Sequence, residues 1–126
     1  MPTAANYVTV PGTDNPIVLP DPQSQINDFH SDDFDAPEAI IRSPAVLFWQ
    51  VKPEGKVRVQ VNLNDQVVSI VNFDSTPQRS WHEVIGEHLV LTQGNHVDIA
   101  VLANEDDGKQ GKVTVSDFVL IYHANV

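Results

Sequence analysis

The sequence of 126 residues contains no cysteine and only one methionine. Without cysteine, the chain can form neither a disulfide framework nor a thiolate metal or redox centre. Its apolar runs, such as residues 45–49, are far too short to cross a bilayer. The N-terminus lacks the basic and apolar segments of a signal peptide. We therefore expect either a cytoplasmic protein or one exported by a signal-independent route, with no membrane insertion.

Basic residues are scarce, and the formal net charge is −10. Residues 1–41 contain acidic side chains but no lysine or arginine. The electrostatic field of this negative charge repels the phosphate backbone of nucleic acids, so we expect no nucleic-acid partner. Either a solvated acidic surface or a site for cations or a basic partner accounts for this acidic first third.

Regular alternation between apolar and polar residues is clearest in residues 56–64. Val57, Val59, Val61 and Leu63 alternate with polar side chains. Because successive side chains of a β-strand point to opposite faces, this period of two predicts a half-buried strand. We expect the four aliphatic side chains to line the interior between two stacked sheets.

Several other segments are short, rich in apolar and β-branched residues and separated by turn residues, and none shows helical periodicity. Many short strands with frequent turn signals predict an all-β fold, an antiparallel β-sandwich of jelly-roll type. We expect an extended, acidic N-terminal arm and loop over residues 1–37 and a β-sandwich domain over 38–126. The other expected strands are 7–10, 17–19, 39–42, 45–52, 66–73, 80–85, 88–91, 96–102 and 112–123.

The N-terminal segment is rich in proline, which lacks an N–H donor and avoids central strands. Its extended pieces are therefore read either as edge strands or as an arm that lies on the body or on a neighbouring subunit. The second interpretation implies a homo-oligomer. We expect residues 25–37 to form a loop anchored by Phe29 and Phe34.

No catalytic motif is visible. The five histidines are scattered, without an H-E-x-x-H motif or a His-x-His pair, and there is neither a G-x-S-x-G nor a phosphate-binding P-loop motif. We therefore expect the histidines to be surface or interface residues and the protein not to be an enzyme.

The densest group of binding-type side chains lies in residues 79–83. On a strand, Arg79, Trp81 and Glu83 share one face. A tryptophan can stack on a sugar ring while charged side chains bond its hydroxyls, and Asn62 and Asn64 offer further polar groups. We predict that these five residues bind ligand. The alternative is that Trp81 packs within the sandwich and that Arg79 and Glu83 form an ion pair.

Asp117 is unusual because it lies in phase with the apolar residues Val113, Val115, Val119 and Ile121. A buried carboxylate needs hydrogen bonds or a cation. We therefore predict a specific buried role for Asp117, either as a metal ligand or as a partner in hydrogen bonds. The alternatives are that the strand bends here or that this row leaves the core. The acidic loops 32–35 and 105–107 are further sources of oxygen ligands for calcium.

Residues 45–122 resemble the jelly-roll, galactose-binding-like carbohydrate-binding modules. The segments that carry this resemblance are A-V-L-F-W-Q-V (45–51), K-V-R-V-Q-V-N-L-N-D (56–65), W-H-E-V-I (81–85), L-V-L-T-Q-G-N-H-V-D-I-A-V (89–101) and V-S-D-F-V-L-I-Y (115–122). The resemblance implies a jelly-roll fold and glycan recognition. It also implies a structural calcium at Asp117, although the N-terminal glutamate pair of such sites has no counterpart here.

Two classes of function follow. The first is a non-catalytic binding module with lectin-like glycan recognition. The alternative is a structural or assembly subunit of an oligomeric particle or viral appendage, to which the N-terminal arm contributes.

Overall fold

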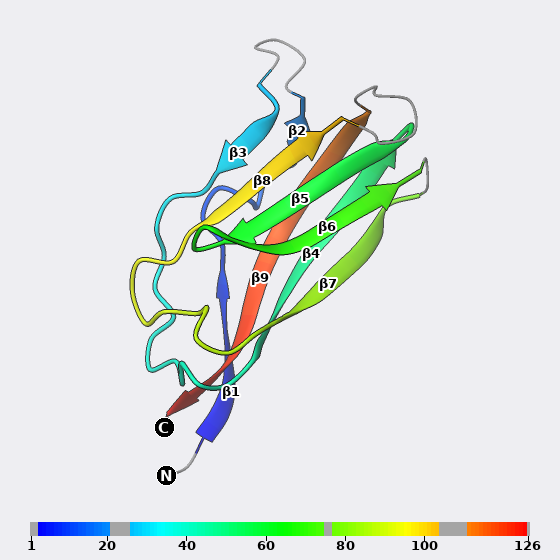
Figure 1. Ribbon diagram of the computed structural model, residues 1–126. Coiled ribbons are helices and arrows are strands. Elements are labelled where there is room, and N and C mark those ends of the chain that lie inside the picture. The colour runs from blue at the N-terminus through cyan, green and yellow to red at the C-terminus, as the bar shows by residue number, and fades with distance from the viewer. Residues whose placement is uncertain (1–2, 21–25, 75–76, 104–110, 126) are drawn as a thin grey trace.

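The computed structural model describes residues 3–20, 26–74, 77–103 and 111–125 (Figure 1). These residues form an all-β fold without helices. No helix of the described chain is therefore long and apolar enough to cross a membrane. The strands are β1 (Thr3–Thr9), β2 (Ile17–Leu19), β3 (Asp28–His30), β4 (Ala45–Glu54), β5 (Val57–Leu63), β6 (Gln66–Phe73), β7 (Arg79–Ile85), β8 (Val97–Leu102) and β9 (Lys112–Asn125).

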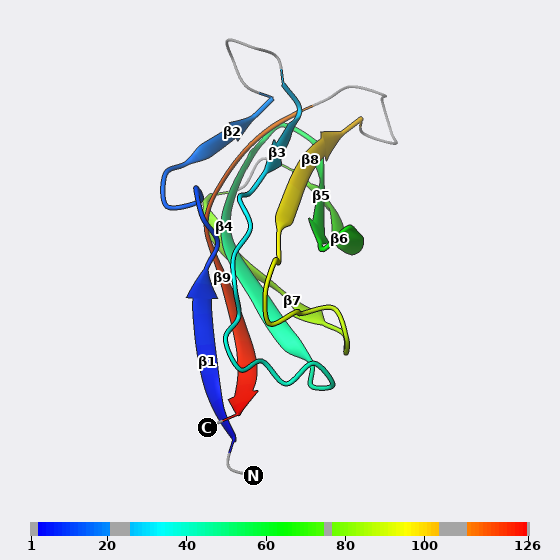
Figure 2. The ribbon, with the colours of Figure 1, turned by 90° about the vertical axis from the view of Figure 1, so that its left-hand side faces the viewer.

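The strands form two antiparallel sheets that face each other as a sandwich. Sheet A has the order β1-β9-β4-β7, with β2 also paired to β9, and sheet B has the order β3-β8-β5-β6. Figure 2 shows β5, β6 and β8 as a layer separate from β1, β4 and β9. The predicted antiparallel β-sandwich is thereby confirmed.

The core lies between the sheets and follows the alternation of the sequence. Val57, Val59, Val61 and Leu63 are all at most 2 % exposed, as predicted. On the inner face of sheet A, the ring of Trp49 on β4 stacks on that of Phe118 on the neighbouring β9 at a centroid distance of 5.2 Å. Side chains buried on both inner faces therefore hold the two sheets together through apolar burial.

The alternation of β9 breaks at Asp117, so the prediction that this side chain shares the apolar row of Val113 and Val115 is wrong. The register with β4 shifts between Phe48 and Gln50, which leaves two residues of β9 opposite Trp49. Asp117 takes a φ of 55° and is exposed, and Phe118 then points inward. This is a β-bulge, and the extra residue moves the buried row from odd to even positions. The alternative expectation of a bend in the strand is the one confirmed.

The N-terminal segment adds strands to both sheets. β1 and β2 lie along β9, and β3 lies along β8. β3 falls within residues 25–37, where we expected only a loop, although Phe34 is buried there and Phe29 packs against the core as predicted.

Residues 39–42 and 88–91 were expected as strands but form turns and irregular backbone, with a single bridge at Ala39.

Candidate functional site

Arg79, Trp81 and Glu83 share one face of β7, where Trp81 and Glu83 are half-buried and Arg79 is exposed. Trp81 lies opposite the buried Trp49, and its ring meets that of Phe73 edge-on at 5.2 Å. Its indole N–H donates to Glu83 Oε1 over 3.0 Å. Trp81 is thus part of the packing between the sheets, as the alternative interpretation holds. Glu83 Oε1 also accepts from the Ser69 hydroxyl, and no ion pair between Arg79 and Glu83 is found among the described residues.

Asn64 does not lie with this group either. Its Nδ2 donates to the carbonyl of Leu89 and to Asn95 Oδ1, and its Oδ1 accepts from the backbone N–H of His96. Asn62, by contrast, lies on β5 between the buried Val61 and Leu63 and points to the outer face of sheet B. The structure therefore separates the five predicted ligand-binding residues into three environments.

The outer face of sheet B carries a shallow polar cleft. Side chains from three adjacent strands line it, with Asp28 on β3, Asp98 on β8, and Gln60 and Asn62 on β5. Its volume is about 200 Å³. Asn62 pairs directly with Asp98 across β5 and β8, so amide and carboxylate groups stand side by side. Gln60 Nε2 donates to Asn62 Oδ1 over 3.0 Å, which orients both amides.

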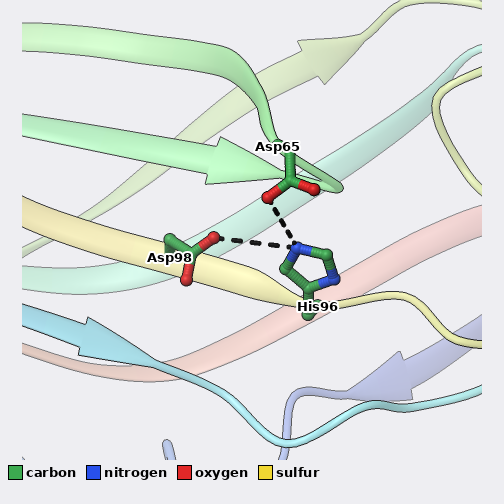
Figure 3. Close-up of side chains that lie close together, drawn as sticks. All are labelled: Asp65, His96 and Asp98. Carbon is green, nitrogen blue, oxygen red and sulfur yellow. Dashed lines mark hydrogen bonds and ion pairs between the residues drawn. The ribbon is translucent and has the colours of Figure 1, made fainter.

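A cluster of histidine and aspartate lies beside this cleft (Figure 3). His96 Nε2 is 3.0 Å from Asp65 Oδ1 and 3.8 Å from Asp98 Oδ2. The other carboxylate oxygen of Asp98 contacts His30 Nδ1, and the rings of His30 and His96 are tilted with centroids 5.2 Å apart. The hydrogen bond from His30 to Asp98 and the charge of that carboxylate raise the pKa of His30 above its ordinary value.

Backbone contacts hold this cluster in place. Asn64 and Asp65 both have positive φ, at 51° and 67°, and form the tight turn between β5 and β6. The N–H of Asn64 donates to the carbonyl of His96 over 3.0 Å, while the N–H of His96 donates to Asn64 Oδ1 over 2.8 Å. The turn that carries Asp65 is therefore hydrogen-bonded directly to His96, the residue immediately before β8.

The five residues predicted from sequence to bind ligand did not include Asp28, Gln60, Asp65, His96, Asp98 or His30, which the structure brings together on this face. One local signal was present, because His96 and Asp98 are two positions apart and so share a strand face. A His-x-His motif would have been recognised as a metal-binding pattern, whereas this His-x-Asp pair was not. Asp65 and His30 join the group only through the pairing of β8 with β5 and β3, which local sequence does not reveal.

Asp117 lies on another part of the surface. With Asp14, it lines a cavity of about 380 Å³ beside residues 9–14 and the bulge. In the described part of the chain, the group of three or more candidate ligands is Asp65, His96 and Asp98, which does not include Asp117. Two carboxylates fit poorly with the six to eight oxygen ligands of calcium. The role of Asp117 as a metal ligand stays a prediction, and the acids at 105–107 lie outside the described residues.

Comparison with known proteins gives a match by structure alone. No protein-family model matches the chain, and no curated protein matches it in sequence. Dimeric latent PorU from Porphyromonas gingivalis gives a TM-score of 0.65 at 10 % identity, covering 99 % of this chain. The chain spans only 13 % of that protein.

Two carbohydrate-binding proteins are also similar. The C-terminal CBM6 of LamC, a marine laminarinase from Zobellia galactanivorans, gives a TM-score of 0.54 at 11 % identity, covering 93 % of this chain and 99 % of the module. The CBM22-1–GH10 modules of Clostridium thermocellum xylanase 10B, in complex with xylohexaose, give 0.53 at 8 % identity, covering 97 % and 25 % of the two chains. The chain therefore has the jelly-roll β-sandwich fold found in carbohydrate-binding modules, as the sequence resemblance predicted.

Proposed function

We propose that this protein is a non-catalytic module that binds glycan in the cleft on the outer face of sheet B. The observation that carries the proposal is the row of planar polar side chains across three adjacent strands, Asp28, Asp98, Gln60 and Asn62. Carboxylates accept and amides both donate and accept hydrogen bonds, which suits the neighbouring hydroxyl groups of a sugar. The fold shared with carbohydrate-binding modules supports the same conclusion by analogy.

The dimensions of the cleft favour a small ligand. Pockets for drug-sized ligands usually enclose about 300–1,000 Å³, whereas this cleft encloses about 200 Å³. The hydrogen bond from Gln60 to Asn62 leaves Gln60 Oε1 to accept and Asn62 Nδ2 to donate, as far as the described residues show. A short part of a glycan, rather than a long buried chain, therefore fits this surface.

A panel of neutral and acidic glycans, screened on the full chain and followed by calorimetric titration, tests the proposal. Gln60→Ala and Asn62→Ala each remove hydrogen bonds worth about 1 kcal/mol, so affinity falls roughly fivefold to tenfold. Gln50→Ala is the matched control, since Gln50 lies on sheet A and its amide bonds Ser80. The lectin hypothesis fails if no glycan of a broad panel binds, with or without calcium.

Titration of Arg79→Ala and Trp81→Phe tells the cleft apart from the site predicted from sequence. If these variants lose glycan binding while Gln60→Ala retains it, the ligand lies at the edge formed by β7. The protein would then still bind glycan, but the cleft on sheet B would not be the site.

The outer face of sheet A favours assembly as a second candidate function. Tyr7, Ile121, Val46 and Val84 lie opposite one another in a row across β1, β9, β4 and β7. Tyr7 is 67 % and Val84 69 % exposed, so this row presents apolar surface to solvent. Contiguous exposed apolar side chains are typical of interaction surfaces.

Light scattering coupled to size exclusion tests this second candidate. A homo-oligomer that Val84→Asp converts to monomers would support an assembly role for the outer face of sheet A. A monomer at high protein concentration would contradict it.

A further inference from the structure

We propose that Asp65, His96 and Asp98 form a binding site for a divalent transition metal of the zinc class, with His30 as a positioning residue. The site lies where the turn between β5 and β6 meets the start of β8 (Figure 3). It does not depend on the proposed glycan binding, although Asp98 also lines the cleft.

The separations between the donor atoms suit a small ion. One ligand atom from each of the three residues lies within 4.8 Å of the others. Both carboxylates approach the same nitrogen, His96 Nε2, at 3.0 and 3.8 Å. Bonds of about 2.0–2.2 Å in a tetrahedral zinc site place neighbouring ligand atoms roughly 3.3–3.6 Å apart. Small side-chain rotations are therefore enough to bring the three atoms to these separations.

The chemistry of the donors selects the class of metal. Imidazole nitrogen suits zinc, copper and nickel, whereas calcium takes oxygen ligands, usually six to eight of them. His96 supplies nitrogen, and the two aspartates supply oxygen atoms that neutralise a divalent charge. The metal would occupy the position of the proton that His96 Nε2 shares with Asp65.

The backbone positions of the three ligands are fixed before any metal binds. The side chain of His96 is only 19 % exposed, and the reciprocal hydrogen bonds between Asn64 and the backbone of His96 fix the turn beside it. Asp98 lies within β8 between the buried Val97 and Ile99. Because the backbone positions are set by the sheet, little ordering of the backbone opposes binding.

His30 extends the site outward. It contacts the carboxylate oxygen of Asp98 that does not face His96. Hydrogen-bonded partners of this kind orient metal ligands in known metal sites. With three protein ligands, a fourth position stays open for water or a small ligand, as in catalytic zinc sites. The position of His30 thus gives Asp98 one oxygen for the metal and one for the histidine.

Titration of the full chain with ZnCl₂, after removal of metal with EDTA, tests the proposal. Calorimetry gives stoichiometry and affinity, and NMR shows which histidine ring resonances shift. We expect one zinc per chain, with the largest shifts at His96, and no competition from equimolar calcium. Asp65→Asn and His96→Gln each reduce affinity by at least about tenfold, and His30→Gln reduces it less.

His82→Gln is the matched control, because His82 lies on β7 and contacts Phe48 rather than the cluster. Circular dichroism of each variant checks that it is folded. Asp65 has an 80 % exposed side chain, and its change to Asn keeps the turn chemistry. The proposal is overturned if zinc does not bind up to millimolar concentration. It is equally overturned if His96→Gln and Asp65→Asn bind zinc as tightly as His82→Gln does.

Discussion

Substitution of Asn95 by alanine is expected to destabilise the fold more than any exposed polar substitution, because this side chain joins three loops. Asn95 is 0 % exposed. Its Oδ1 accepts from Asn64 Nδ2 and from the N–H of Leu91, at 2.9 and 2.8 Å. Its Nδ2 donates to the carbonyls of Phe34 and Leu91, at 3.2 and 2.7 Å. One amide thus connects the segment before β4, the segment before β8 and the turn between β5 and β6.

The magnitude follows from these four hydrogen bonds. A net contribution of about 1 kcal/mol for each gives roughly 4 kcal/mol, and buried groups left without partners add to the cost. A domain of this size has a free energy of unfolding of about 5–15 kcal/mol, so the loss is large but measurable. We therefore expect Asn95→Ala to lower the free energy of unfolding by about 3–5 kcal/mol.

Equilibrium unfolding in urea, followed by tryptophan fluorescence, measures this loss. Asn62→Ala is the matched control, since it makes the same chemical change on the outer face of sheet B and should cost no more than about 0.5–1 kcal/mol. A loss below about 1 kcal/mol for Asn95→Ala, or one equal to that of Asn62→Ala, would refute the role of Asn95 as a connector.

Three further predictions concern the bulge, the core and a buried phenol. Thr13→Val removes the hydroxyl that accepts from the buried N–H of Phe118 over 3.1 Å. It should lower the free energy of unfolding in urea by about 1–3 kcal/mol, and Thr13→Ser should lower it less. Equal losses for the two variants would contradict this. Trp49→Phe should cost less than about 2 kcal/mol, against about 3–5 for Trp49→Ala, because the indole N–H has no hydrogen-bond partner in the described structure. Burial raises the pKa of Tyr122, while the hydrogen bond from Asn6 opposes the rise. Absorbance titration should therefore show a phenol that ionises above the ordinary tyrosine pKa of about 10 and that is lost in Tyr122→Phe, and Asn6→Ala should raise this pKa further. Because the neutral phenol is favoured in the folded state, this contribution to stability is present below about pH 10 and is lost as the pH rises through the pKa of folded Tyr122.

The sheet architecture was predictable because burial imposes a period of two on each long strand. Val57, Val59, Val61 and Leu63 show it without interruption, and their burial follows. β3 could not be found in this way, since its three residues contain a single alternation around Phe29. Its formation depends on pairing with β8, a contact between segments far apart in the sequence.

The phase of β9 was not predictable from alternation alone, because a pattern-based argument assumes an unbroken strand. Asp117 breaks it by taking a positive φ, which aspartate tolerates better than most residues. Its N–H and that of Phe118 then bond the carbonyl and the hydroxyl of the buried Thr13. The signal was the aspartate itself, a residue that is depleted in strands and frequent where the chain turns.

Residues of the candidate site contribute less to the stability of the fold than residues of the core do. Gln60, Asn62 and Asp98 occupy the outward positions of β5 and β8, whose inward positions hold the buried Val61 and Ile99. The inward positions are constrained by packing, whereas substitutions at outward positions usually change stability by no more than about 0.5 kcal/mol. This explains how proteins with about 10 % sequence identity share the same sandwich fold. The side chains of the outer face can change their chemistry while those of the inner face preserve the packing of the two sheets. Variants of the cleft and of the histidine–aspartate cluster should therefore alter binding without unfolding the protein, which makes loss of binding in folded variants a direct test of both proposals.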